Sequence, residues 1–448
     1  MTARHQVECA RGQWGRIALG LLGYNLALLV VSPILIAWLL WRVLIQRKRI
    51  GSWGQRLGFA PRPPVAAHPR VWLHAVSAGE MAALQPVLEA LRAARPDSYL
   101  AVSTVTETGM AVAQSTCRAA DSIFYLPFDW ADCMALALWR VRPELVVVAE
   151  KELWPNLLGL ARLLGMQTLV INGRVSDRMM WRARRARSLV RWLYELPSCL
   201  CVQSPLDAER LEQIGVPAAR VVVAGNTKAD GMAERDGALE ARLAQALGVS
   251  ADEVWLVAGS THAGEEEAVA EAFTRIRAKL PRARLLLAPR HLERVAEVSA
   301  VLAQRGLPVV RRSEAAGLDD AIVILDTMGE LRSAYALGAG CFVGGTLTPI
   351  GGHNPLEPVA VGRPALFGPY TANCSDVADL VVNAGVGFRI TGAEDLAAQF
   401  LRLVTDAALR DRIARDGPAL IAAQRGAAPR CANIAVAMLE EKPSDRPR

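Results

Sequence analysis

Short apolar runs alternate with longer amphipathic stretches along most of this chain. The runs are apolar at consecutive positions, which is typical of strands in a parallel sheet covered on both faces. The stretches between them, such as Leu84–Arg95 and Pro205–Ile214, have the length of helices, so the alternation predicts a doubly wound α/β fold. The predicted strands are Val71–Val76, Tyr99–Val105, Ser122–Leu126, Leu145–Ala149, Thr168–Ile171, Leu200–Gln203, Val221–Ala224, Val254–Ala258, Arg284–Ala288, Ala321–Leu325, Cys341–Val343 and Pro364–Phe367.

This rhythm breaks once, in the polar, alanine-rich stretch from about Asn226 to Asp252. The strands before and after the break form two sets, and a length of 448 residues also favours two cores. We therefore expect two Rossmann-like domains that face a cleft, with ligands beyond the carboxyl ends of the strands. The expected N-terminal domain covers residues 51–230, the C-terminal domain 231–435, and a charged tail 436–448.

The N-terminal region, residues 1–50, predicts a membrane anchor with a basic flank. Residues 17–41 contain no charged side chain and are long enough to cross a bilayer as a helix. No cleavage-site pattern follows, which favours an uncleaved anchor over a signal peptide. A helix that is buried, or that lies at the membrane surface without crossing, is the alternative. The positive charges that follow place the body on the cytoplasmic side; they are Arg42, Arg47, Lys48, Arg49 and Arg56.

Positive charge also gathers in residues 173–192, where arginines interleave with aromatic and aliphatic residues. The net charge of +7 favours anionic partners in general. A basic helix with aromatic residues suits an anionic membrane surface, while a solvated helix face is the plainer interpretation. Nucleic acid would attract the same charges, but an anchored protein makes it the less favoured partner. The arginines expected at the membrane or its lipids are Arg174, Arg178, Arg182 and Arg185.

Polar residues gather where the predicted strands end. After the first strand the chain reads "HAVSAGE" (74–80), and Glu80 is either a helix-starting carboxylate or a group placed to take a proton. A helix start favours the ionised carboxylate, and Pro86 is expected to make the first turns irregular. Other strand ends carry "AEKELWPN" (149–156), "NGRVSDR" (172–178), "GNTKAD" (225–230), "GSTHAGEEE" (259–267), "APRH" (288–291), "DTMGEL" (326–331) and "GGTLTPIGGHNPLEP" (344–358).

The glycine-rich stretch 344–358 predicts a phosphate site. Its glycines allow tight turns, and Asn354 can cap a helix that has Pro355 at its first position. Exposed backbone N–H groups and the helix dipole would then bind phosphate, and Glu357 could accept hydrogen bonds from ribose hydroxyls. A structural glycine turn is the alternative, but Arg290 and Lys228 add cations that pair with phosphate or carboxylate. The absence of the Walker and GxGxxG patterns argues against a P-loop NTPase and against NAD.

Neither the histidines nor the cysteines have the spacing of metal ligands. The eight cysteines include no CxxC pair, so we expect free thiols. His74 is expected to hydrogen-bond within the core, and His262 and His291 are expected to be polar loop residues. His353 is either a ligand or a capping group. No Asp-x-Asp cluster suggests a metal-bound diphosphate, so no metal is predicted.

Taken together and in this order, the quoted motifs resemble those of the Kdo (3-deoxy-D-manno-octulosonic acid) transferases, glycosyltransferases that add Kdo to a lipid A precursor. The resemblance extends from the apolar N-terminal segment to about residue 435, and "GGHNPLEP" is a specific part of it. It implies a GT-B fold, an acceptor site mainly in the first domain and a CMP-Kdo site mainly in the second. It also implies a role in lipopolysaccharide synthesis at the inner membrane and no cofactor.

The resemblance further implies roles for individual residues. Glu80 matches the proton acceptor of an inverting transfer, and Glu150 and Lys228 match groups that stabilise the transition state. We place Ser77 and Gly79 next to the acceptor. The segments that would bind CMP-Kdo contain Pro289, Arg290, Met328, Gly329, Glu330, Asn354, Pro355, Leu356 and Glu357.

The sequence departs from the family pattern at three positions. Lys151 stands where threonine is usual and adds a positive charge beside Glu150, and Thr227 and Ala229 replace bulkier apolar residues. Three other functions remain compatible with the residues: a GT-B transferase that uses a UDP-sugar, a nucleotide-sugar 2-epimerase, and a membrane-tethered sensor of sugar nucleotides. The epimerase would need no lipid acceptor and no anchor, and the sensor would not need Glu80.

Overall fold

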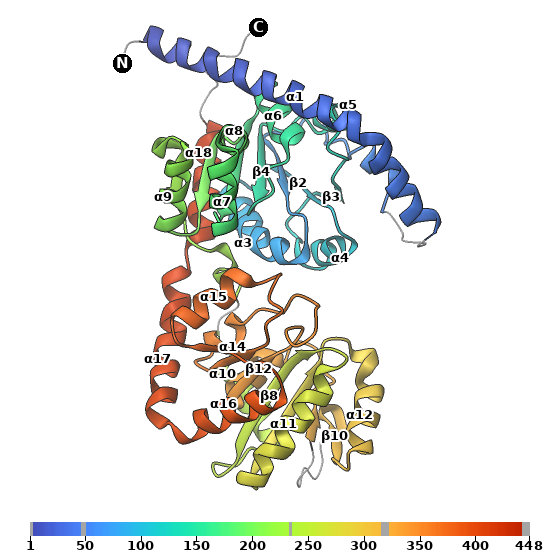
Figure 1. Cartoon of the computed structure of the whole chain (residues 1–448), viewed down its shortest axis with the longest axis vertical. Coiled ribbons are helices and arrows are strands. Elements are labelled where there is room, and N and C mark those ends of the chain that lie inside the picture. Colours follow the sequence, from blue (N-terminus) through green and yellow to red (C-terminus); the bar gives the residue numbers. More distant parts are fainter. Residues whose placement is uncertain (1–2, 46–50, 233–234, 315–321, 441–448) are drawn as a thin grey trace. The chain divides into compact units, whose positions relative to one another are not determined.

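The computed structural model describes residues 3–45, 51–232, 235–314 and 322–440, and its chain divides into two compact units. The first unit contains the described residues up to Gly231 and those from Gln424 onward, and the second contains the residues between them. Each unit is a parallel sheet with helices on both faces (Figure 1). This confirms the predicted doubly wound α/β architecture.

The sheet of the first unit has seven parallel strands in the order β3-β2-β1-β4-β5-β6-β7. The order reverses between β1 and β4, which makes the gap beyond their carboxyl ends the usual place for a ligand. "HAVSAGE" follows β1, and Glu150 follows β4. The strands are β1 (Arg70–His74), β2 (Tyr99–Thr104), β3 (Ser122–Tyr125), β4 (Leu145–Ala149), β5 (Gln167–Gly173), β6 (Cys199–Val202) and β7 (Val221–Val223).

Helices cover both faces of this sheet because successive strand residues point to opposite sides. Trp72 belongs to one apolar cluster and Leu73 to the other. Helix α3 is continuous from Ala78 to Ala94, so the irregular first turns expected from Pro86 are not observed; the proline lies within the helix. The other helices are α2 (Trp53–Arg56), α4 (Glu107–Thr116), α5 (Ala131–Val141), α6 (Pro155–Leu163), α7 (Asp177–Arg185), α8 (Arg187–Glu195), α9 (Pro205–Ile214) and α18 (Ala427–Glu440).

The second unit repeats this architecture with the order β10-β11-β9-β8-β12-β13-β14, and its order reverses between β8 and β12. The short strands β10 and β14 were not predicted from the sequence, and residue 321 of the predicted third strand of this set lies outside the described residues. The strands are β8 (Val254–Thr261), β9 (Ala283–Pro289), β10 (Val309–Arg311), β11 (Ile322–Ile324), β12 (Gly338–Val343), β13 (Ala365–Phe367) and β14 (Gly387–Arg389). The helices are α10 (Gly237–Ala246), α11 (Glu265–Lys279), α12 (Val295–Gln304), α13 (Leu331–Leu337), α14 (Leu356–Ala360), α15 (Ser375–Asn383), α16 (Ala393–Thr405) and α17 (Ala407–Gln424).

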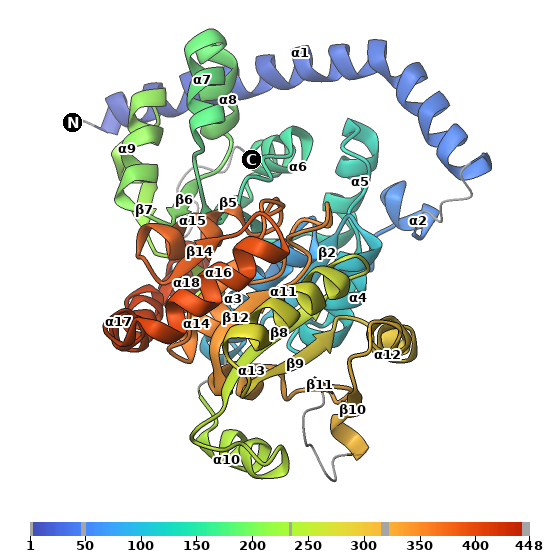
Figure 2. The same ribbon diagram turned by 60° about the horizontal axis from the view of Figure 1, so that its bottom comes forward.

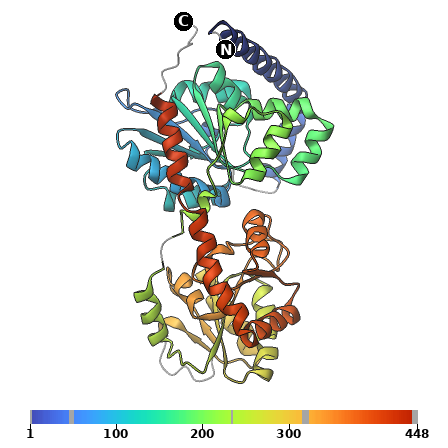
Figure 3. The same cartoon turned by 90° about the vertical axis from the view of Figure 1, so that its left-hand side faces the viewer.

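The end of the chain differs from the predicted domain boundary. We had placed 231–435 in the second domain, whereas residues from Gln424 onward belong to the first unit. There α18 packs on α3 and buries Cys431 in the apolar cluster of that face (Figure 3, red helix). The predicted tail from 436 is still helical up to Glu440, and 441–448 lie outside the described residues.

The apolar N-terminal segment forms α1 (Ala3–Leu44), which has Pro33 in its interior. By length and composition, its stretch Trp14–Trp38, with a mean hydropathy of 2.1, could cross a membrane. Arg56 does not belong to a free basic flank: it is 8% exposed and donates to the carbonyl oxygens of Val105 and Leu126. The predicted flanking residues 47–49 lie outside the described residues.

Candidate active site

Glu80 lies in the first turn of α3, and its carboxyl group folds back over the loop that follows β1. Its Oε2 accepts a hydrogen bond from the Val76 amide at 2.7 Å, and Oε1 accepts one from the Ser77 hydroxyl at 3.4 Å. Desolvation, followed by the nearby Glu152 carboxylate, raises the pKa of Glu80 to about 8, although the Val76 hydrogen bond opposes this rise. Glu80 is therefore mostly protonated at pH 7, and the prediction of an ionised carboxylate is wrong. Desolvation and the nearby negative charges raise the pKa more than the helix start lowers it.

Glu150 follows β4 with a φ of 60°, a left-handed conformation that is uncommon outside glycine. Asn172, near the end of β5, shares this feature with a φ of 55°. Its side-chain amide lies 3.4 Å from the Glu150 carboxylate, and the Lys228 ammonium lies 2.7 Å from the same oxygen, Oε1. Unusual backbone conformations at adjacent strand ends cost energy and persist where the surroundings hold them, which is typical of functional sites.

Lys228 is held in the 3-10 helix η2 (Thr227–Ala229) by several hydrogen bonds. The Asn226 side chain accepts from the Lys228 amide at 3.1 Å, and the Asn172 side chain accepts from the Thr227 amide at 3.0 Å. The Thr227 hydroxyl donates to the Ala83 carbonyl of α3 at 2.7 Å. With only 9% of its surface exposed, Lys228 is thus fixed against Glu150.

The structure therefore brings Glu80, Glu150 and Lys228 together at the reversal point of the first sheet. The charge of Glu150 also contributes to the raised pKa of Glu80, which places the two carboxyl groups within electrostatic range. Glu152 and Asn172 were not predicted to have a role in the site. Both belong to the polar strand ends "AEKELWPN" and "NGRVSDR", and this position is the feature that could have identified them. Lys151, one of the three departures from the family pattern, is exposed.

In the second unit, the predicted phosphate cradle is largely occupied by the protein itself. Glu265, which is fully buried at the start of α11, accepts hydrogen bonds from the amides of Gly345, Thr346 and Leu347 at 2.7–2.8 Å. It also accepts from the His262 amide at 3.0 Å. These three amides are therefore not available to a phosphate, and the first half of the glycine-rich stretch is held by a buried carboxylate.

The second half of that stretch agrees better with the prediction. The Asn354 side chain accepts from the Leu356 amide at 3.1 Å, but Pro355 rather than Asn354 occupies the cap position, so the predicted cap is shifted by one residue. Helix α14 begins just after Pro355 but has only five residues, so its dipole is small. Desolvation raises the pKa of the Glu357 carboxyl group, and the charges of Arg332 and Arg290 oppose that rise. The "APRH" and "NPLEP" segments therefore lie close together.

The remaining residues predicted to bind the donor lie in two segments, one at the end of β9 and one just before α13. Pro289 is buried at the end of β9, and the following Arg290 is exposed. Met328 is 78% exposed, beside Gly329 with its φ of 84°. Glu330 lies 3.3 Å from Arg312, and both side chains line a cavity that also contains Arg242, Gln245 and Ala246.

His74 lies in the core of the first unit, whereas His262, His291 and His353 form a cluster in the second unit. His74 is fully buried with its ring beside Ser103, as expected, and burial lowers its pKa to about 3. In the second unit the Nε2 atoms of His262 and His353 are 2.8 Å apart, and the His291 ring lies edge-on to His262. Burial lowers the pKa of His353 to about 4, so this pair is neutral at pH 7. Among the described residues, no group of histidine, cysteine, aspartate or glutamate side chains could hold a metal ion.

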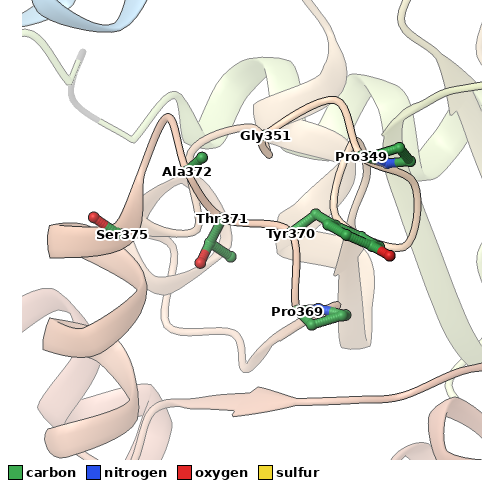
Figure 4. A pocket seen from close by; sticks show the side chains of 7 residues that line it. All are labelled: Pro349, Gly351, Pro369, Tyr370, Thr371, Ala372 and Ser375. Carbon is green, nitrogen blue, oxygen red and sulfur yellow. The ribbon is translucent and has the colours of Figure 1, made fainter.

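A hollow of about 360 Å³ lies beside the glycine-rich stretch (Figure 4). Pro349 and Gly351 form one side, and Tyr370 and Thr371 form part of the other. The Asn373 amide donates to the Gly351 carbonyl at 2.8 Å, which joins the two loops. The hollow thus has a defined shape at the carboxyl ends of β12 and β13.

The predicted membrane arginines differ in their exposure. Arg178, Arg182 and Arg185 are exposed on α7, where Trp181 is 53% exposed beneath the Arg185 guanidinium. Arg174 is only partly exposed and precedes the helix. The basic and aromatic surface therefore consists of α7 and the start of α8 rather than of the whole stretch 173–192.

Comparisons with known proteins identify relatives over most of the chain. A family model described as 3-deoxy-D-manno-octulosonic-acid transferase (kdotransferase) matches residues 51–231. The 3-deoxy-D-manno-octulosonic acid transferase of Bordetella pertussis is 31% identical over 427 residues, which are 90% of this chain and 96% of that protein. The enzyme of the same name from Haemophilus influenzae is 28% identical, with 93% and 98% covered. A bifunctional glycosyltransferase/methyltransferase of Fusobacterium nucleatum is 30% identical over 72% of this chain, which spans only 51% of that longer protein.

Solved structures share the fold at low sequence identity. UDP-GlcNAc 2-epimerase from Neisseria meningitidis, bound to UDP-GlcNAc, has a TM-score of 0.54 with 12% identity, covering 83% of this chain and 100% of its own. Anabaena HepE in complex with UDP-glucose has a TM-score of 0.51 with 13% identity, covering 83% and 100%. These likenesses confirm the predicted GT-B fold and carry no further conclusion about the substrate.

Proposed function

The chain belongs to the 3-deoxy-D-manno-octulosonic acid (Kdo) transferase family, and we propose that it transfers Kdo from CMP-Kdo to lipid IV-A, a lipid A precursor, with Glu80 as the proton acceptor. It is a glycosyltransferase of lipopolysaccharide core synthesis. The observation that carries the proposed mechanism is the partly buried Glu80 carboxyl group, with a pKa of about 8, in the same unit as the Glu150–Lys228 pair.

A sugar hydroxyl is a weak nucleophile at neutral pH, so a positioned base helps by removing its proton as the new bond forms. The raised pKa makes Glu80 a stronger base than an ordinary carboxylate. In the proposed step, the acceptor oxygen bonds to the anomeric carbon of Kdo, its proton moves to Glu80, and the bond from that carbon to the phosphate oxygen breaks. CMP leaves with the electron pair, and the anomeric configuration is inverted.

Glu150 and Lys228 would stabilise this step without taking the proton. Lys228 is the buried cation of the first unit that the resemblance assigns to the transition state, and its ion pair with Glu150 fixes the ammonium in place. A fixed charge stabilises a developing charge without reorganising during the reaction. Ser77, whose hydroxyl contacts Glu80, and Gly79 would then lie next to the acceptor.

The donor would bind in the second unit. The exposed Arg290 supplies a cation for phosphate or carboxylate, and the neighbouring Glu357 supplies an acceptor for ribose hydroxyls. Because Glu265 occupies the amides of residues 345–347, we assign the loop a shaping role and place the phosphate nearer Arg290 and Asn354. Met328, Gly329 and Glu330 complete the proposed donor segments.

The decisive experiment incubates the purified protein with CMP-Kdo and lipid IV-A and measures the product masses. We expect the acceptor to gain the mass of one or more Kdo residues, and the size of the gain counts them. UDP-sugars offered in place of CMP-Kdo serve as the control. No mass gain with CMP-Kdo, or a gain with a UDP-sugar alone, would contradict the proposal.

A further inference from the structure

One face of α1 packs on the first unit over several turns. Ile17 is fully buried and Leu21 is 4% exposed, and both belong to the apolar cluster that contains Leu157 and Leu158 of α6. Close approach requires small residues: a Cβ atom added at Gly159 would lie 2.7 Å from the Leu21 side chain. Figures 1 and 2 show this helix lying along the unit beside α6.

Two polar residues of the docked stretch of α1, Tyr24 and Asn25, have partners on the first unit. The Tyr24 hydroxyl donates to the Asp129 carboxylate at 2.9 Å. Asn25 and Asn156 exchange two side-chain hydrogen bonds, at 2.8 and 3.0 Å. We call these four residues the polar clasp. In hydrocarbon, Tyr24 and Asn25 would lose these partners, and their polar groups would be left without hydrogen bonds, which is strongly unfavourable.

The opposite face of α1 is apolar and uncovered. Leu19, Leu29 and Val30 are 71–77% exposed, and Leu22 and Leu26 are more than half exposed. Contiguous apolar surface of this kind marks an interaction site in soluble units. From Pro33 onward, every α1 residue whose side chain is described is exposed.

The same stretch cannot be docked and also cross a bilayer. The candidate span is Trp14–Trp38, and its first half is the docked part. From Leu29 to the end of α1 at Leu44 the helix is roughly 24 Å long at 1.5 Å per residue. The hydrocarbon core is about 30 Å thick, so the undocked remainder is too short to cross it unaided.

A basic surface lies next to the docked helix. Helix α8 contacts α1, where Trp192 packs on Gly20 and Arg16 lies 3.7 Å from Glu195. The adjoining end of α7 and start of α8 expose Arg184, Arg185 and Arg187. Cations beside an apolar helix are complementary to anionic headgroups above an acyl layer.

We propose that α1 does not cross the membrane but lies in its surface, with the polar clasp holding one face on the first unit and the apolar face in the acyl layer. The partner is an anionic lipid bilayer, whose headgroups the arginines of α7 and α8 contact. This inference rests on the proposed membrane-borne acceptor, and it adds that the whole first unit is held flat against the leaflet that carries that acceptor.

A cysteine pair tests the docking in membranes of cells that express the full chain. Leu21→Cys combined with Gly159→Cys replaces a close contact and leaves room for the new side chain. We expect a disulfide to form on mild oxidation. The matched control combines Leu21→Ala, which keeps the room beside Gly159→Cys, with Leu22→Cys, which points its cysteine outward and should not cross-link. Equal cross-linking of both pairs, or of neither, would overturn the inference.

A second measurement uses the native Cys9, which precedes the docked stretch, and a Cys introduced at the exposed Ala407. A membrane-impermeant maleimide is applied to sealed vesicles of both orientations, with Cys9→Ser as the background. We expect both positions to be labelled in the same vesicle orientation. Labelling in opposite orientations would show a crossing helix and overturn the inference. If Kdo transfer persists in that case, the proposed function stands.

Discussion

The raised pKa of Glu80 predicts a strong pH dependence of transfer. Desolvation and the neighbouring Glu152 raise this pKa to about 8, and only the ionised carboxylate can accept the proton. At pH 7 about one tenth of the free enzyme would be ionised at Glu80. kcat/KM is therefore expected to rise about tenfold from pH 6 to pH 7 and less steeply as the pH approaches 8, which amounts to about 50-fold between pH 6 and pH 8.

The assay measures initial rates of Kdo transfer at subsaturating substrate across this range, with CMP-Kdo affinity measured at each pH to separate binding from chemistry. Replacing Glu152 by Gln removes the second cause of the shift, so its profile should move to lower pH. A kcat/KM that is flat from pH 6 to pH 8 would refute the reasoning, because it is the result expected for a carboxylate with an ordinary pKa. An unchanged profile in Glu152→Gln would refute the electrostatic part alone.

Three further predictions concern stability and binding. A carboxyl group with a raised folded-state pKa destabilises the fold as pH rises from about 4.5 to 8, so Glu80→Gln should raise the Tm increasingly across this window; a pH-independent difference would argue against burial as the cause. Lys228→Met removes the ion-pair partner of Glu150 and should lower the Tm, and it should lower kcat by about 100-fold or more. The double variant that also carries Glu150→Gln should recover the Tm but not kcat. Recovery of both would show that Lys228 has no catalytic role. Glu265→Gln removes a charged acceptor from buried amides and should cost about 1–3 kcal/mol of unfolding free energy and weaken CMP-Kdo binding, as measured by denaturation and titration; unchanged affinity would separate the loop from the donor site.

Most strands of both sheets could be predicted from the sequence because each of these is a continuous apolar run. The missed strands, β10 and β14, have three residues each and include Arg311 and Arg389, so they lack that signal. Helix α18 was placed in the wrong unit because its buried face consists mainly of alanine and cysteine. Such small residues predict that a helix forms, but they do not indicate which of the two sheets the helix packs against.

The candidate site was predictable in its residues but not in its electrostatics. The resemblance to the family predicted roles for Glu80, Glu150 and Lys228, and the structure brings these residues together at the carboxyl-terminal edge of the first sheet. Helix position alone predicted an ionised Glu80, because it ignored burial and the charge of Glu152. Glu265 could not be recognised as the partner of amides some 80 residues away, since that contact depends on the order of β8 and β12 in the sheet.

The most direct test of the account compares the protein with its Glu80→Gln variant in CMP-Kdo binding and in Kdo transfer to lipid IV-A. The substitution keeps the size and the position of the side chain but removes its ability to accept a proton. We predict unchanged affinity for CMP-Kdo and transfer reduced to a trace. Near-normal turnover by the Gln variant would contradict the assignment of Glu80 as the proton acceptor.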